Sequence, residues 1–492
     1  MLSESHIDIY EGADPKLLAR ARGLRQSLTE RSQYRVRLLN ERHSEDRLSE
    51  IDREIADLRD SYEQSEAEIR ATSPSFAALT QPRPLTTGQI QQLLDPDTVL
   101  LEYSLGEEHS YVWLVTDRSV AIYQLPKRAE IERPARRLYR YLTARSRQER
   151  TDVDSEMANW ARSDVRAHGL APGLSRTLLR PVENLIKGKR LLIVSDGALQ
   201  YIPFSALPAP DNVQQPLIVE HEIVNSPSAS VLSEIRRAST DRPAASGEVA
   251  VLADPVFDAS DDRVNSANNG PTPEPRLTRA SETVRRSARD VGLTEKQGIY
   301  LGRLIYSRDE AKAILAVVPH AKAIEVLDFE ANRETALNPE LARYRIVHFA
   351  THGFLDSKRP ELSGLVLSMV NRQGKPRDGF LGLEDVYNTK LPVDMVVLSG
   401  CQTGLGEDIS GEGLIGLTRG FMYAGATRVV ASLWSVDDFT TSQLMAKFYR
   451  GIERDKMTPA AALRKAQIEM WQHRGWQAPY YWAAFQLQGE WR

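Results

Sequence analysis

The 492 residues carry a formal net charge of −4, with 41% hydrophobic and 26% charged residues. This composition is that of a globular protein too long for one hydrophobic core, so two or three domains are expected. The slightly acidic balance argues against direct nucleic-acid binding, which goes with a basic excess. No run approaches about 20 consecutive apolar residues, and the polar N-terminus does not resemble a signal peptide. We therefore expect a cytoplasmic protein without a membrane partner.

The first 75 residues predict a helical hairpin. Leucines, isoleucines and alanines recur at helical spacing over residues 17–28 and again over 48–58, and a polar turn at 40–44 separates the two runs. No 34-residue repeat is visible, so tetratricopeptide repeats are not predicted here. We expect the hairpin to pack without chemistry of its own.

Residues 76–245 predict a mixed α/β unit that contains no cysteine. Apolar runs bounded by turn residues predict its strands, and longer stretches with helical spacing predict its helices. The predicted strands cover residues 98–104, 111–116, 120–125, 190–194 and 217–225, and the predicted helices cover 128–147, 152–186 and 228–235. A strand at 248–252 opens the next unit, and the composition of residues 254–298 favours a disordered loop.

Helices and strands alternate over residues 308–492. Predicted helices cover 308–317, 333–337, 414–424, 440–453 and 459–473, and predicted strands cover 323–327, 345–349, 364–368, 394–398, 428–431 and 482–486. Such alternation is typical of a mostly parallel sheet with helices on both faces, which predicts an α/β fold for residues 246–492.

Cys401 is the single cysteine of the chain, which excludes an internal disulfide framework and any multi-cysteine metal site. A free cysteine is most often a small buried apolar residue, so its neighbours must indicate more. Here the predicted strand ends at Leu398, and Cys401 follows in a turn between Gly400 and Gly404. Glycines beside a thiol leave room for a substrate carbonyl, which favours a nucleophile. No cofactor is expected.

His352 occupies the equivalent place after another predicted strand, in a turn before Gly353. A histidine in a turn is often a surface residue, but the carboxyl ends of parallel strands meet at one sheet edge, where an imidazole can accept the proton of a thiol. The separation 401 − 352 = 49 is close to the roughly 50 residues between histidine and cysteine in caspases. We predict His352 as the base, with the Gly353 and Cys401 amides as an oxyanion hole. His348, inside the strand, is interpreted as a core residue rather than a metal ligand.

Three longer motifs carry a family resemblance: LLIVSDGALQYIPFSAL at 191–207, HFATHG at 348–353 and LSGCQTG at 398–404. With GEGL at 411–414, GFMYAGA at 420–426 and ASLWSVDD at 431–438, residues from about 185 onward resemble a CHAT domain. This is a caspase-like, separase-related cysteine peptidase domain often found beside tetratricopeptide repeats in bacteria. The family's His–Cys pair falls on His352 and Cys401.

The resemblance also implies an organisation for the whole chain. It implies a catalytic caspase-like half at 246–492, preceded by a degenerate, pseudo-caspase-like half at 76–245. The hairpin at 1–75 would be a remnant of a helical repeat region, through which a regulatory protein could bind.

Substrate specificity is predicted from the run Trp434-Ser-Val-Asp-Asp438. It is similar to a separase run whose acidic residues read a P1 arginine, so Asp437 and Asp438 are candidates for the S1 pocket. An equally direct interpretation makes them the N-cap of the helix predicted from about residue 440. Ser399 replaces an aspartate that reads basic P1 residues in metacaspases, and it too is a candidate for the S1 pocket.

The functional hypothesis is a regulated cysteine endopeptidase that cleaves a specific protein partner in bacterial defence or cell-death signalling. One alternative is a catalytically silent caspase-like scaffold for protein–protein interaction. Another is a peptidase that cuts its own 254–298 loop, where four arginines are candidate sites. These arginines are Arg276, Arg279, Arg285 and Arg286.

Overall fold

The computed structural model describes residues 45–72, 84–146, 153–240, 242–264, 301–354, 363–402 and 412–492, together with residues 14, 16–21, 23–24, 27 and 31. The chain forms two compact units, residues 1–84 and 85–492. In the first unit, helix α2 (Glu45–Thr72) contains the second predicted helix, and ion pairs join Arg20 to Glu68 and Arg31 to Glu54. The turn predicted at 40–44 lies outside the described residues, so the hairpin stays a prediction.

The second unit is a large α/β domain. Its strands are β1 (Thr98–Ser104), β2 (Ser110–Val115), β3 (Val120–Leu125), β4 (Arg190–Val194), β5 (Ile223–Asn225), β6 (Gly247–Pro255), β7 (Ala323–Asp328), β8 (Tyr344–Ala350), β9 (Gly353–Phe354), β10 (Gly364–Val366), β11 (Phe380–Gly382), β12 (Met395–Leu398), β13 (Cys401–Gln402), β14 (Arg428–Ser432) and β15 (Phe485–Gly489). Its helices are α4 (Thr87–Leu93), α5 (Arg128–Leu142), α6 (Val153–Leu179), α7 (Glu183–Ile186), α8 (Ala229–Ser239), α10 (Ile305–Leu315), α11 (Arg333–Ala336), α12 (Leu383–Tyr387), α13 (Glu412–Tyr423), α14 (Asp438–Glu453) and α15 (Pro459–Gln472).

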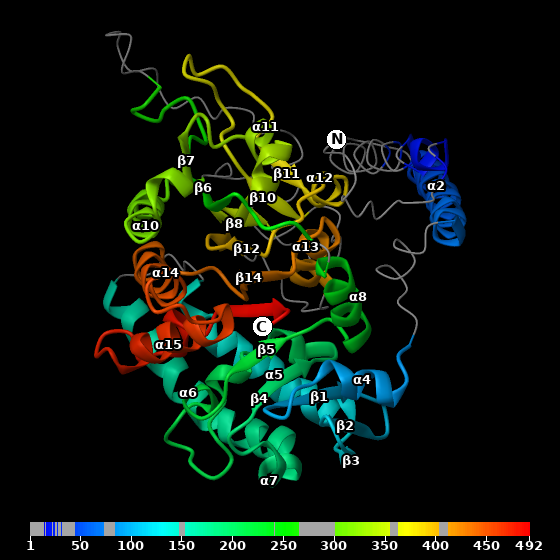
Figure 1. Ribbon diagram of the computed structural model, residues 1–492, viewed down its shortest axis with the longest axis vertical. Helices are drawn as coiled ribbons and strands as arrows, with labels where there is room; N and C mark the ends of the chain where they lie inside the picture. Colours follow the sequence, from blue (N-terminus) through cyan, green and yellow to red (C-terminus); the bar gives the residue numbers. More distant parts are fainter. Residues whose placement is uncertain are drawn as a thin grey trace. The chain divides into compact units, whose positions relative to one another are not determined.

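An eleven-stranded sheet runs through the domain in the order β3-β2-β1-β4-β5-β15-β14-β12-β8-β6-β7. Only β1–β2, β2–β3 and β14–β15 pair antiparallel among its described strands. Helices α10, α14 and α15 lie along one side of this sheet, and α12 and α13 lie on the other (Figure 1). The predicted α/β fold with a mostly parallel, helix-covered sheet is confirmed.

Residue burial explains which strands are central. All residues of β12 and β14, and all but the first two of β8, are buried, as expected of parallel strands covered on both faces. The edge strand β3 instead alternates between exposed and half-buried side chains, so one of its faces is solvated.

The two predicted halves contribute to the same sheet and the same apolar core. Strand β5 of the first half pairs with β15 of the second, with Asn225 opposite Gln488. The side chains of Tyr139 and Ser146 donate hydrogen bonds to the carbonyls of Leu433 and Ser435, at 2.9 and 2.7 Å. The first half therefore braces the segment between β14 and α14, while the boundary at 245/246 stays a prediction.

Two predicted strands start several residues before the observed ones. Residues 217–219 form a 3₁₀ turn after Pro216, so only 223–225 of the predicted strand 217–225 joins the sheet. The last strand begins at Phe485 rather than 482, because Pro479 starts a 3₁₀ turn that places Trp482 just outside the strand. Within the described part of the chain, every helix is too short or too polar to span a bilayer.

Candidate active site

The backbone brings the two predicted catalytic segments side by side. Strands β8 and β12 are parallel neighbours, with Phe349 opposite Leu398 at their carboxyl ends. Beyond the large sheet, the segments that follow β8 and β12 form the strands β9 and β13 of a four-stranded sheet of order β11-β10-β9-β13. There Cys401 pairs directly with Gly353, the residue that follows His352. The expectation that the two segments meet at one sheet edge is therefore met by the backbone, while the Cys401 side chain lies outside what the structure describes.

Gly400 is required for this close approach. A Cβ atom at this position would lie 2.3 Å from the carbonyl oxygen and 3.1 Å from the nitrogen of Thr351. Because real Cβ atoms do not approach backbone atoms that closely, any side chain here would push the cysteine segment away from the histidine segment.

His352 is held in a buried and oriented position. The residue is 6% exposed, its ring packs against the Phe257 ring with centroids 5.0 Å apart, and its Nε2 lies 2.8 Å from the carbonyl oxygen of Gly302. A carbonyl can only accept a hydrogen bond, so Nε2 carries the proton and the Nδ1 lone pair is left to accept one. Burial lowers the pKa of His352 below its ordinary value, which keeps the imidazole neutral at pH 7.

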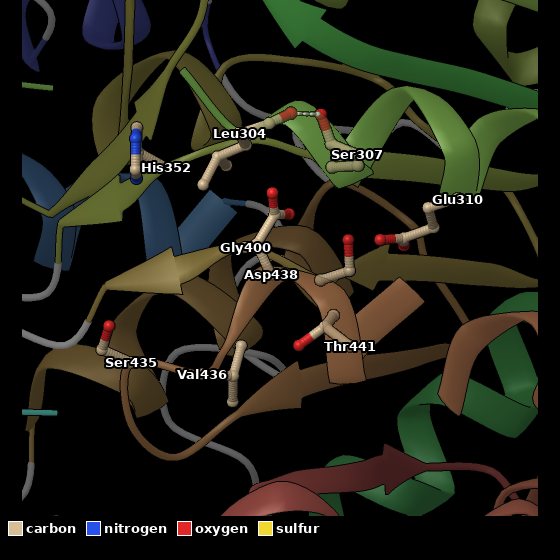
Figure 2. Close-up of a pocket in the computed structure, with 11 residues that line it drawn as sticks. Leu304, Ser307, Glu310, His352, Gly400, Ser435, Val436, Asp438 and Thr441 are labelled. Carbon is tan, nitrogen blue, oxygen red and sulfur yellow. Dashed lines mark hydrogen bonds between the residues drawn. The ribbon is translucent and has the colours of Figure 1, made fainter. Parts of the chain in front are cut away.

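A pocket with about 430 Å³ of empty space, including its open mouth, lies beside His352. It is lined by residues from four segments: Leu304, Ser307 and Glu310; Ala350 and His352; Ser399 and Gly400; and Ser435, Val436, Asp438 and Thr441. Figure 2 shows the carboxyl group of Glu310 pointing back into the pocket, toward the side on which Asp438 lies. The pocket thus combines the predicted base with two acidic groups.

Glu310 is an acidic residue of α10 that is only 1% exposed. Its Oε1 lies 2.7 Å from Nε2 of His348, an ion-pair distance, yet among the described residues no donor is aligned with this oxygen for a hydrogen bond. His348 also contacts the hydroxyls of Tyr449 and Ser399, at 2.9 and 3.2 Å. The prediction that His348 lies in the core is confirmed, and its network adds a polar wall to the pocket.

The two aspartates of the Trp434–Asp438 run have different roles. Asp437 is exposed and caps α14, because its Oδ1 accepts a hydrogen bond from the Thr440 amide at 2.9 Å. Asp438 lines the pocket, and its Oδ2 accepts a hydrogen bond from the Tyr306 amide at 2.8 Å. Ser399 also lines the pocket, so two of the three S1 candidates lie together and Asp437 does not line it.

A model of the CHAT domain matches residues 169–490, more than half of the chain. The chain belongs to the CHAT domain family. Among curated proteins, it is 33% identical over 105 residues to human tetratricopeptide repeat protein 28 and 31% identical over 113 residues to the mouse protein. These matches cover 21% and 23% of the chain but only 4% of each relative.

Two solved structures of the Saccharomyces cerevisiae separase–securin complex are similar in fold to this CHAT protein. One matches with a TM-score of 0.52 at 9% identity and the other with 0.48 at 10% identity. Each match covers 87% of this chain and 32% of the separase chain. The first of these supports a separase-like, caspase-like fold for the chain.

In this CHAT domain, the carbonyl of Gly302 is held in place by an ion-pair cluster. The neighbouring Arg303 donates two hydrogen bonds to the Asp254 carboxylate, at 2.8 and 2.7 Å. Asp254 is fully buried at the end of β6, and it also accepts from Arg308 at 2.7 Å and pairs with Arg263 at 3.0 Å. These contacts fix the segment that binds His352 Nε2.

Sequence reasoning missed Gly302, Asp254 and Glu310 as parts of the CHAT site. Gly302 acts through a main-chain carbonyl, which no side-chain pattern indicates. Glu310 lies in a helix whose charged residues are otherwise ordinary, and Asp254 and Arg263 fall in the loop predicted at 254–298. The available signal was an acidic residue, Asp254, directly after an uninterrupted buried strand.

Proposed function

We propose that this CHAT protein is a cysteine endopeptidase in which Cys401 is the nucleophile and His352 the base. The observation that carries the proposal is the pairing of Cys401 with Gly353, next to a buried histidine whose Nε2 is already bonded to Gly302. This arrangement leaves Nδ1 of His352 as the proton acceptor on a side chain next to the cysteine segment. A silent scaffold has no need of a neutral, oriented imidazole there.

The reaction follows from these groups. His352 Nδ1 takes the proton of the Cys401 thiol, and the thiolate sulfur attacks the carbonyl carbon of the scissile peptide. The amides of Gly353 and Cys401 are the proposed donors to the oxyanion. The imidazolium then protonates the leaving amine as the C–N bond breaks, which leaves a thioester on Cys401. Water attacks the thioester, His352 accepts its proton, and the carboxylic acid leaves as the thiol is restored.

The acidic pocket supports a preference for substrates with a basic P1 residue. Glu310 and Asp438 place two carboxyl groups in a pocket beside the base, and the described residues that line it include no arginine, lysine or second histidine. Glu310 already faces His348 at 2.7 Å, so a lysine or arginine of the substrate is expected mainly beside the half-buried Asp438 carboxylate, with Glu310 adding negative charge. The S1 pocket of this proposal is thus formed by Asp438, Ser399 and Glu310.

The preference for a basic P1 residue is expected to depend on pH. Burial raises the pKa of Asp438 to about 6, and the nearby Glu310 and Asp437 carboxylates add to the effect. Above pH 6 the group is ionised and attracts the cation, and below pH 6 it is neutral. The ratio of kcat/KM for an arginine substrate to that for its uncharged citrulline analogue should therefore fall as pH drops through about 6. A ratio that stays constant, or that is unchanged by Asp438→Asn, would contradict this role.

The experiment that tests the function is cleavage of a peptide library with every P1 residue by the wild type and by Cys401→Ala. We expect cleavage after arginine or lysine that disappears in the variant. Cleavage that persists in Cys401→Ala would reject the nucleophile, and cleavage only after apolar or acidic residues would reject the S1 assignment.

The substrate and regulation are proposed from similarity. The curated relatives are named for tetratricopeptide repeats, and the matched separase is in complex with securin. By analogy, we propose a protein substrate and a regulatory protein that binds through residues 1–75, in bacterial defence or cell-death signalling. Because the chain spans only 4% of the curated relatives, their whole-protein roles enter only as this proposal.

A further inference from the structure

An exposed apolar ledge borders the acidic pocket. It consists of the exposed side chains of Ile305, Tyr306 and Phe439, which are 62%, 40% and 41% exposed, backed by the half-buried Trp476. The Tyr306 and Phe439 rings lie 5.1 Å apart, and the Phe439 and Trp476 rings lie 6.2 Å apart. Exposed large apolar side chains that gather in this way, rather than singly, are typical of binding surfaces.

The ledge is linked to the pocket by its neighbours in sequence and by one hydrogen bond. Ile305 and Tyr306 stand between Leu304 and Ser307, which line the pocket, and Phe439 stands next to Asp438, which also lines it. The Tyr306 amide donates to the Asp438 carboxylate at 2.8 Å, so the ledge begins at the acidic group itself. A polypeptide that places a cation beside Asp438 therefore passes close to the Tyr306 end of the ledge.

The pocket indicates what kind of molecule this is. Asp438 and Glu310 place two carboxyl groups in the pocket, and Glu310 Oε1 lies 2.7 Å from His348 Nε2. The Asp438 carboxylate, which accepts from the Tyr306 amide at 2.8 Å, can also accept from the ammonium or guanidinium of a side chain that enters from outside. In an extended peptide, side chains two residues apart point the same way and are about 7 Å apart. An apolar side chain two residues from the basic one can then lie on the ledge.

We infer that the ledge binds a large apolar side chain located two residues from the lysine or arginine that enters the acidic pocket. The occupant is a substrate polypeptide, and the inference rests on the proposed function for the direction of the peptide past Cys401. It assigns Phe439, Tyr306 and Ile305 as specificity-determining residues. Peptides with a basic residue but only small or polar neighbours are therefore poor ligands.

The test measures peptide binding by the full chain with Cys401→Ala, so that it does not depend on cleavage. Labelled peptides contain one arginine in a glycine–serine background, with a leucine or phenylalanine moved through the positions on either side. We expect an apolar residue two positions from the arginine, on one side, to lower Kd about tenfold, as partial burial of such a side chain would. Phe439→Ser and, separately, Ile305→Ser should remove this gain and leave the Kd of the background peptide unchanged.

Val165→Ser is the matched control, because Val165 is 73% exposed on α6 and does not belong to the ledge. It should keep the full gain. The inference is overturned if no apolar position tightens binding, or if the gain survives in Phe439→Ser and Ile305→Ser. It is also overturned if these variants lower the melting temperature without changing peptide binding, because that result would mean that another segment of this chain covers the ledge. If Cys401→Ala binds the peptides as expected but the wild type cleaves none of them, the proposed peptidase function is rejected while the inferred binding surface is supported.

Discussion

Replacing His352 by alanine is expected to lower kcat between about 10² and 10⁴-fold, the range that a positioned general base contributes. The reason is that His352 is buried, neutral and tied to Gly302 through Nε2, so its loss leaves the Cys401 thiol without a proton acceptor. The pKa of His352 is lowered by burial, so the acid limb of kcat for an uncharged substrate should lie below pH 6.5, the ordinary value. A stopped-flow or fluorogenic assay across pH would measure both effects.

His320 offers a matched control, because it is an exposed histidine in a 3₁₀ turn away from the pocket. His320→Ala should keep full activity and the same pH profile. If His352→Ala lost less than tenfold in kcat, or if its acid limb matched that of the wild type, His352 would not be the base.

Replacing Asp254 by alanine is expected to reduce the free energy of unfolding by about 3–5 kcal/mol, the usual cost of removing one partner from a buried ion pair. Asp254 is fully buried and is in contact with the guanidinium groups of Arg263, Arg303 and Arg308, which would be left without this carboxylate. Its φ of +47° adds strain for any residue other than glycine, in a position that its contacts now stabilise. Denaturant unfolding followed by intrinsic fluorescence would measure the change.

Asp309→Ala is the control for this prediction, since Asp309 is an exposed residue of the same region that pairs with Lys312 at 3.2 Å. Such a surface pair contributes about 0–1 kcal/mol, so its loss should barely shift the transition. Asp254→Ala should also lower kcat, because Arg303 holds the segment whose Gly302 carbonyl orients His352. If Asp254→Ala were as stable and as active as the wild type, the ion-pair cluster would not be what positions Gly302 and His352.

The strands that carry the site were predictable because their burial is uniform. The runs that became β8 and β12 are mostly apolar and buried, and parallel pairing of such runs places the residues after them at one edge. The short strands β9 and β13 were not predicted, since two residues have no periodicity to detect. They form because Gly400 lets the turns after β8 and β12 approach closely. This close approach depends on both segments together, so neither segment's sequence predicts it alone.

The pocket was only partly predictable for a similar reason. Asp438 was proposed from its motif, but the same motif offered Asp437, and only the helix start at α14 separates a cap from a pocket residue. Glu310 comes from α10, more than a hundred residues earlier in the chain, and it meets Asp438 through packing of α10 near α14. Long-range packing of this kind leaves no local sequence signal.

The central claim is that Cys401 and His352 act as one unit, and covalent labelling tests it most directly. An arginine chloromethyl ketone would be incubated with the wild type, Cys401→Ala and His352→Ala, and intact masses would be recorded over time. We predict one adduct on the wild type, none on Cys401→Ala, and labelling of His352→Ala that is slower by at least about 10². An adduct on Cys401→Ala, or equal rates for wild type and His352→Ala, would contradict the account.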